Sequence, residues 1–390
     1  MGSFREFLRN NVRQYAMLIA LLCIMLFFQV ATEGVLLVPM NVTNLVLQNA
    51  YVFILAIGMT LTILTGGNID LSVGSIVAFV GALAGTFVIT MKMSVGAGIA
   101  LSLLAGLGIG VWQAFWIAYV RLPSFIVTLA GQLVFRGLTV FMLKGLTIGP
   151  FPESFQMISS GFVPDLIGGE ESELNLLALA AGAAVAALYI LAQLRQRVYR
   201  RRNGYESTPV PIFAGGLVLV TGVIALASYW LASYRGLPII FIIIGALIVA
   251  YSFFTSRTVP GRYLYAMGGN EKAAQLSGIN TNKVLFFAYV NMGVMAAVAG
   301  IAVSSRLNAS SPLAGQNFEL DAIAACFIGG ASATGGIGTI VGAIIGALVM
   351  GVLNNGMSIM GIGSDIQMVV KGLVLLAAVA FDVLSKRKAR

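Results

Sequence analysis

The chain has 390 residues, of which 59% are apolar and only 9% are charged. A soluble domain carries roughly 25% charged residues, and a disordered chain combines low hydrophobicity with high charge, so the composition excludes both classes. The formal net charge is +9. Because the basic residues lie in short loops between apolar runs, they indicate membrane topology rather than nucleic-acid binding. The composition therefore predicts an all-α, polytopic membrane protein.

Apolar segments of about 20 residues, the length that crosses a bilayer, recur along the chain and predict twelve spans. The first follows a basic stretch, as in a signal peptide. It is long and lacks a clear cleavage site, so we expect an uncleaved helix. The tenth and eleventh are short and rich in glycine, which leaves open whether they cross fully or form a re-entrant pair. The predicted spans are 16–36, 45–65, 70–90, 95–119, 124–143, 174–194, 212–231, 238–254, 284–304, 320–335, 338–354 and 366–384.

Four basic clusters orient this bundle. They lie at 5–13, 195–202, 257–283 and 386–390, and twelve spans place all four on one side. The positive-inside rule assigns that side, with both termini, to the cytoplasm. The connection 145–173 lies on the opposite side. It has no basic residue, and its acidic residues Glu153, Asp165, Glu170, Glu171 and Glu173 predict a solvated loop rather than a docking surface.

Several kinds of catalytic chemistry have no signature in the sequence. The chain has no His and no G-x-x-x-x-G-K-[ST] loop to hold nucleotide phosphates. Its two cysteines, Cys23 and Cys326, lie in apolar runs and are interpreted as small hydrophobic residues. We therefore expect no enzyme activity, no catalytic residue, no metal site and no cofactor.

Ionisable residues within membrane segments are the usual functional signal in such a protein. Arg136 lies in the middle of its span, and either a structural role or a role in a transport pathway would explain it. The carboxylates Asp70, Asp321 and Asp365 lie at span ends, where we expect water to reach them. A helix N-terminal charge that complements the macrodipole is the alternative interpretation.

Most polar residues inside the predicted spans are uncharged. Amide and hydroxyl groups would suit a polyhydroxylated solute, whose hydroxyls are costly to desolvate without replacement partners. Hydrogen bonding between helices is the alternative for each of them. The candidate residues of a translocation path are Asp70, Ser72, Arg136, Asn291, Asp321, Asn354 and Asn355.

Glycines four residues apart form ladders at 81–85, 106–110 and 338–346. Such ladders let two helix backbones approach closely. We expect their partner helices to belong to the same chain.

The stretch from Gly261 to Ile279 lies between two spans on the basic side. Asn270 suits an N-cap, Glu271 suits a first turn and Gly278 suits a C-terminal stop, so a two-turn helix between glycine-rich hinges is predicted. A helix this short needs a partner surface in water. The expected apolar surface consists of Ala273, Ala274 and Leu276. An ordinary connector that packs on its own bundle is the alternative.

That stretch, read with other segments in the same order, resembles the permease subunit of bacterial monosaccharide ABC importers of the ribose, xylose and galactose type. The matching segments are 69–75, 123–131, 136–137, 261–280, 319–325 and 354–356. The resemblance implies a permease in the bacterial inner membrane that works as a homodimer with cytoplasmic ATP-binding subunits and a periplasmic sugar-binding protein. ATPase coupling would fall on Asn270, Glu271, Ala273, Ala274, Leu276, Ser277 and Gly278.

The chain departs from the smaller ribose-type permeases over about 165–236, which resembles an inserted two-span hairpin. This length is typical of the D-xylose and multiple-monosaccharide subgroup. The resemblance thus implies a single permease domain over 1–390, with a ten-span core, the inserted hairpin and a cytoplasmic coupling loop at 255–283. An ion-coupled secondary transporter is the alternative. Deep carboxylates would favour it, and the sequence indicates none.

Overall fold

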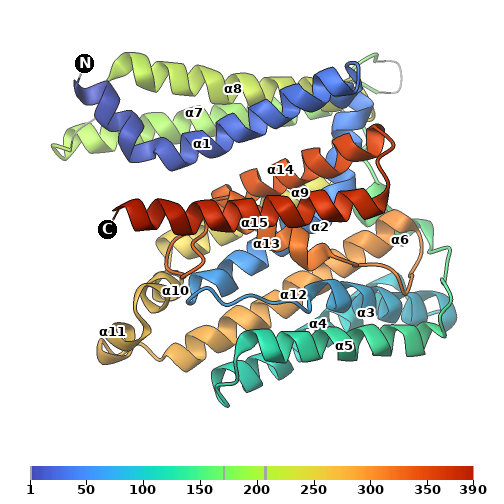
Figure 1. Ribbon diagram of the computed structural model, residues 1–390. Helices are drawn as coiled ribbons and strands as arrows, with labels where there is room; N and C mark the ends of the chain where they lie inside the picture. The colour runs from blue at the N-terminus through green and yellow to red at the C-terminus, as the bar shows by residue number, and fades with distance from the viewer. Residues whose placement is uncertain (1, 170–171, 206–208, 390) are drawn as a thin grey trace. The chain divides into compact units, whose positions relative to one another are not determined.

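The computed structural model describes residues 2–169, 172–205 and 209–389. The regular structure of this part of the chain is helical (Figure 1). Ten of the described helices are long and apolar enough to cross a membrane. These findings confirm an all-α, polytopic membrane protein. The presence of twelve spans and the location of both termini on the cytoplasmic side of the membrane stay predictions. Glu170, Glu171 and Arg390, named above, lie outside the described residues.

The helices follow one another with short connections. In chain order they are α1 (Gly2–Ala31), η1 (Val35–Leu37), α2 (Pro39–Leu64), α3 (Val73–Gly85), η2 (Thr86–Thr90), α4 (Val95–Ala118), α5 (Ser124–Leu143), α6 (Glu153–Ser160), α7 (Leu176–Arg202), α8 (Val210–Ala232), α9 (Ile239–Arg257), α10 (Val259–Gly269), α11 (Glu271–Leu276), α12 (Thr281–Leu307), α13 (Phe318–Ile328), α14 (Ile340–Ile359) and α15 (Ser364–Ala389).

The described residues divide into two compact units. The larger unit contains residues 2–36, 45–160 and 240–389. Its centre is α2, whose most apolar window is 89% buried. Side chains on every face of this helix, from Val52 to Leu64, are fully or almost fully covered. A helix that is apolar all round must be buried in lipid or in protein, and α2 is buried in protein.

Glycine contacts bring α12 against α4 in the larger unit. A Cβ atom placed on Gly110 would lie 2.8 Å from the carbonyl oxygen of Val290, and one on Gly106 would lie 2.3 Å from the Cβ of Ala297. The ladder at 338–346 packs in the same way, because a Cβ on Gly346 would lie 1.9 Å from the carbonyl oxygen of Ala325. Both ladders therefore find partners within the chain, as expected.

Two membrane segments are interrupted. The predicted span 70–90 becomes helical only at Val73, and the predicted span 320–335 is helical only to Ile328. The eleven residues of α13 rise about 16 Å, too little for a hydrocarbon core of about 30 Å. The non-helical stretches 65–72 and 329–339 touch each other. The amide nitrogen of Gly336 donates to the carbonyl oxygen of Leu64 at 3.1 Å. Of the alternatives left open for 320–335, the end of α13 at Ile328 fits a broken segment.

The smaller unit contains Leu37–Asn44 and the described part of 161–239. Its helices α7 and α8 pack against each other. At their contact, a Cβ on Gly182 would lie 1.8 Å from the Oγ of Ser228. Asp165 accepts hydrogen bonds from four backbone amides, those of Ile167 and Gly168 in the turn that follows it and those of Leu176 and Leu177 at the start of α7. These bonds, that from Gly168 first, lower the pKa of Asp165. This member of the predicted solvated loop is thus fixed to the backbone.

Candidate functional site

The stretch 255–283, which was predicted to be cytoplasmic, contains two short helices, α10 and α11, instead of a loop with one helix. In α11 the Oδ1 of Asn270 accepts the amide of Ala273 at 3.0 Å, as an N-cap does. Gly278 has a φ of +84° and follows the helix end, and the amide of Ile279 donates to the carbonyl of Ala274 at 3.0 Å. This pattern is a Schellman stop. The caps lie where expected, but α11 has only six residues, and the glycines at 268 and 269 end α10.

Helix α10 anchors this stretch to the larger unit. Leu264 is buried in a cluster with Ile57 and Leu61 of α2, Ala288 of α12 and Ile340 of α14. One turn later Met267 is buried against residues of α4, α5 and α12, among them Ala114, Val127 and Leu285. A displacement of α10 would therefore be passed directly to several membrane helices.

The end of α10 also meets both interrupted segments. A Cβ on Gly268 would lie 1.8 Å from the carbonyl oxygen of Leu64 and 2.3 Å from the amide nitrogen of Gly336. Only a glycine permits this approach. The hydroxyl of Tyr265 adds a hydrogen bond of 3.0 Å to the carbonyl of Gly338. Helix α10 is therefore in contact with the points where the helical structure of two membrane segments is broken.

The outer surface of α11 differs from the expected one. Leu276 is 86% exposed, and Ala273 is also exposed. Ala274 is only 4% exposed and packs inward, so its inclusion in the outer apolar surface was wrong. Ser277 and Gly278 are exposed beside Leu276. Leu276 and Ala273 therefore form the exposed apolar part of the outer surface of α11.

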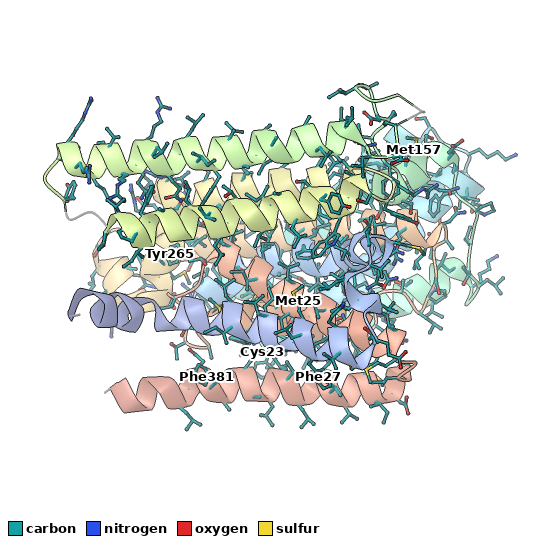
Figure 2. All side chains as sticks on the ribbon, turned by 90° about the horizontal axis from the view of Figure 1, so that it is seen from above. Cys23, Met25, Phe27, Met157, Tyr265 and Phe381 are labelled. Carbon is teal, nitrogen blue, oxygen red and sulfur yellow. The ribbon has the colours of Figure 1, made fainter. Side chains whose placement is uncertain are left out.

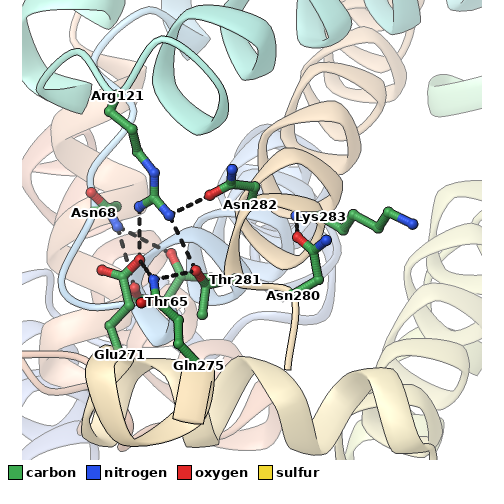
Figure 3. A network of polar contacts seen from close by, with 9 residues as sticks. All are labelled: Thr65, Asn68, Arg121, Glu271, Gln275, Asn280, Thr281, Asn282 and Lys283. Atoms are coloured by element: carbon green, nitrogen blue, oxygen red, sulfur yellow. Dashed lines mark hydrogen bonds and ion pairs between the residues drawn. The ribbon is translucent and has the colours of Figure 1, made fainter. Parts of the chain in front are cut away.

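A polar network holds the inner side of α11 (Figure 3). Arg121, in the turn between α4 and α5, donates to Glu271 Oε1 at 2.7 Å and to Thr281 Oγ1 at 3.1 Å. Its guanidinium also donates to Asn282. Gln275 donates to Thr281 Oγ1 at 2.9 Å. The sequence analysis missed Arg121, although a lone arginine just before a proline turn on the basic side was the available signal.

The second group of candidates lies at the start of α3. Asp70 Oδ1 accepts from the Oγ of Ser72 at 2.6 Å and from its amide at 2.9 Å. Gln113 of α4 donates to the same hydroxyl at 2.6 Å. Asp70, Ser72 and Gln113 are all fully buried. The expectation that water reaches Asp70 was therefore wrong, because the interrupted segment 65–72 carries it into the bundle.

Arg136 of α5 donates through Nη1 to the carbonyl oxygens of Pro312, at 2.9 Å, and Ala314, at 2.7 Å. This confirms that its guanidinium finds acceptors inside the protein. Glu319, which the sequence analysis did not single out, is 7% exposed and interacts electrostatically with Arg136, Asp321 and Asp70. Gln132 of α5 approaches Glu319 at 3.5 Å. Arg136 thus fixes the chain that leads into α13.

The contacts of Arg136 predict how its variants behave. In Arg136→Leu the carbonyls of Pro312 and Ala314 lose their donor, so we expect less folded protein in the membrane. Arg136→Lys keeps the charge but not the fork of donors, and we expect partial retention of abundance and uptake. Quantitative immunoblots of membranes and uptake assays check both variants. Normal abundance with lost uptake in Arg136→Leu would contradict this bracing role and favour contact with the solute.

Asp321 of α13 is fully buried and pairs with Lys371 of α15 at 3.0 Å. Tyr51 of α2 donates to Asp321 Oδ2 at 2.6 Å, and its ring stacks on Phe318 with centroids 3.5 Å apart. Asp321 is therefore a second deep carboxylate, contrary to the expected solvated end. Its pairing with Lys371 identifies it as a link between three helices.

The remaining candidates lie in separate places. Asn291 accepts a hydrogen bond from Tyr251. Asn354 donates to Asn49 Oδ1 at 3.1 Å, which joins α14 to α2. Asn355 is 3% exposed. The contacts of Asn291 and Asn354 fit hydrogen bonding between helices. Asp70, Arg136 and Asp321 instead interact electrostatically with Glu319, and Ser72 is hydrogen-bonded to Asp70.

A family model described as "Branched-chain amino acid transport system / permease component" matches residues 41–379. The xylose transport system permease protein XylH of Escherichia coli (strain K12) is 39% identical over 388 residues, which cover 99% of this chain and 96% of that protein. XylH of Haemophilus influenzae is 39% identical over 384 residues, 97% and 98% of the two chains. The ribose import permease protein RbsC of Escherichia coli (strain K12) is 34% identical over 342 residues, 88% and 85% of the two chains. No solved structure matches the chain.

Proposed function

The chain belongs to the family of branched-chain amino acid transport system permease components, and we propose that it is the permease subunit of an ATP-driven importer of monosaccharides. The observation that carries the proposal is the near full-length similarity to permeases named for xylose and ribose transport. The chain is a multi-pass protein of the bacterial inner membrane and not an enzyme. ATP hydrolysis belongs to a separate subunit, and a sugar-binding protein delivers the solute. These relatives do not favour an ion-coupled secondary transporter.

We place the contact with the ATP-binding subunit on the exposed side of α11, around Leu276. Closure of the ATP-binding subunits would push α11 and α10. Through Leu264, Met267 and Gly268 this push would reach α2, α4, α12 and the interrupted segments 65–72 and 329–339. Non-helical backbone at membrane depth is tolerated only where protein buries it or where it lines a cavity, and transporters commonly bind their solute at such discontinuous helices.

The proposed solute is a xylose-like aldose. Identity is 39% to the xylose-named relatives and 34% to the ribose-named one. The description of the family model mentions amino acids instead. ATP hydrolysis by the complete transporter, measured with its binding protein and one solute at a time, separates these classes. We expect D-xylose to stimulate hydrolysis more than D-ribose, and leucine not to stimulate it. Stimulation by leucine alone would contradict a sugar importer.

We further propose twelve membrane crossings, cytoplasmic termini and a pair of permease copies. The ten long apolar helices would supply ten crossings, α1 would supply another, and α13 with the non-helical stretch 329–336 would supply the last. The contact of Gly336 with Leu64 supports this, because it brings the end of that stretch to the end of α2.

We also propose that the inserted hairpin, predicted at about 165–236, is a peripheral element that lies away from the transport pathway. Its supporting observation is the compact unit that residues 161–239 form with Leu37–Asn44. In a Cys23→Ser background, cysteines at the exposed positions Ile167 and Tyr205, near the ends of the hairpin helices, should react with a thiol reagent equally with and without sugar and binding protein. A cysteine at Gln132 serves as the positive control. Protection at both hairpin positions would place α7 and α8 beside the pathway.

A further inference from the structure

We propose that Arg121 is a positioning residue that ties the coupling helix α11 to α5, and thereby to the buried polar residues around Glu319. The inference rests on the proposed function, because it assumes that α11 receives a push from the ATP-binding subunit. It adds a polar link to α5 beside the apolar contact that α10 makes through Met267 and Val127. Helix α10 reaches α2, α4, α5, α12 and α14 through apolar side chains, whereas Arg121 stands three residues before the first residue of α5 and bonds to α11 itself.

The backbone at Arg121 is held in an unusual conformation. Its φ is +65°, in the left-handed region that non-glycine residues rarely adopt. Such a conformation persists when surrounding contacts determine it. Here the contacts are those of the guanidinium, which reaches Glu271 on α11 together with Thr281 and Asn282 at the start of α12 (Figure 3). The turn between α4 and α5 is therefore attached to the first residue of α11 and to the first turn of α12.

The geometry requires an arginine. One terminal nitrogen, Nη1, bonds to Glu271, and the other, Nη2, bonds to Thr281 and Asn282. A lysine has one ammonium nitrogen and could not reproduce this divided arrangement. The side chains of Arg121 and Glu271 are 40% and 41% exposed, so this ion pair adds little to the stability of the fold. The role of this ion pair is to hold α11 in a fixed position relative to α5.

From Arg121 the connection continues along α5. Gly131 lies against Gln113 and Ser72, since its Cβ would be 2.6 Å from Gln113 Nε2 and 3.4 Å from the Cβ of Ser72. Gln132 approaches Glu319, and Arg136 holds the carbonyls of Pro312 and Ala314. The thirteen residues from Ser124 to Arg136 rise about 18 Å as one helix. A movement of α11 would thus reach the first turns of both α3 and α13 through a rigid element.

A double-mutant cycle on the complete transporter tests this role. The cycle consists of Arg121→Ala, Glu271→Ala and the double variant that carries both substitutions. Two further variants are Arg121→Lys and a charge exchange, in which Arg121→Glu and Glu271→Arg are combined. The measurement is the increase in ATP hydrolysis caused by sugar-loaded binding protein, with D-xylose as the probe. Membrane abundance and co-purification of the ATP-binding subunit are measured alongside it.

We expect each single alanine variant to lower the stimulation roughly fivefold at normal abundance and with the ATP-binding subunit still bound. The double variant should be no worse than either single variant, because both remove the same link. The charge exchange should restore part of the stimulation. The stimulation of Arg121→Lys should lie between that of Arg121→Ala and that of wild type. Stimulation in wild type should also weaken at high salt, which screens the pair.

Normal stimulation in Arg121→Ala would overturn the proposal, and so would additive losses in the double variant. Low abundance of all Arg121 variants would overturn it too, because Arg121 would then be a folding residue. Failure of the proposed function gives a different pattern. In that case Leu276→Arg would also leave stimulation and binding of the ATP-binding subunit unchanged.

Discussion

We expect Leu276→Arg to leave the permease folded in the membrane and to abolish both sugar uptake and sugar-stimulated ATP hydrolysis. The side chain is 86% exposed and has no packing role within the chain, so the change should alter the stability of the permease by less than about 0.5 kcal/mol. In the contact with the ATP-binding subunit the same change would bury an unpaired guanidinium, which costs several kcal/mol. Co-purification of the ATP-binding subunit and hydrolysis rates measure the effect.

Two variants control this experiment. Leu276→Met keeps an apolar side chain of similar volume and should retain most of the activity. Leu166→Arg makes the same substitution at a leucine that is 82% exposed in the connection before α7, and it should behave as wild type. Normal stimulation and normal subunit binding in Leu276→Arg would place the docking surface elsewhere.

The second large effect concerns the buried ion pair. We expect Lys371→Met to lower the amount of folded permease sharply, because it leaves the fully buried carboxylate of Asp321 without its cation. Removing one partner of a buried pair costs about 3–5 kcal/mol, which is a large share of the stability of a typical domain. Detergent-solubilised protein should show lower abundance and an earlier thermal transition.

The double variant Lys371→Met with Asp321→Asn should recover much of that loss. The asparagine is neutral, and its amide oxygen can still accept the hydrogen bond of Tyr51. Lys283→Met, at the start of α12, is a control for loss of a lysine elsewhere and should be stable. A stable Lys371→Met protein would show that this pair is not a structural link.

Hydropathy predicted the membrane class and most of the helices, because a bilayer leaves a continuous apolar chain little choice but helix. The caps of α11 were also predictable, since Asn270 and Gly278 act on backbone within a few residues. The interruptions at 65–72 and 329–339 were not predictable. Gly67 and Gly335 serve contacts between stretches that are more than 260 residues apart, and an isolated hydropathy profile has no signal for such a contact.

The deep carboxylates show the same limit. Asp70 and Asp321 stand at the edges of apolar runs, where a solvated helix end is the ordinary interpretation. Their burial depends on segments that enter the bundle without helical structure and on partners such as Gln113 and Lys371. Arg121 and Glu271 are likewise separated by 150 positions. Each of these pairs needed the fold before it could be found.

Uptake of radiolabelled D-xylose into liposomes tests the central claim most directly. The liposomes would contain the permease with its ATP-binding subunit, and the sugar-binding protein would be enclosed on the side opposite to ATP or added there. Accumulation should require ATP and both partner proteins and should persist when a protonophore and the absence of sodium remove ion gradients. Accumulation by the permease alone, driven by a proton or sodium gradient without ATP, would contradict the account.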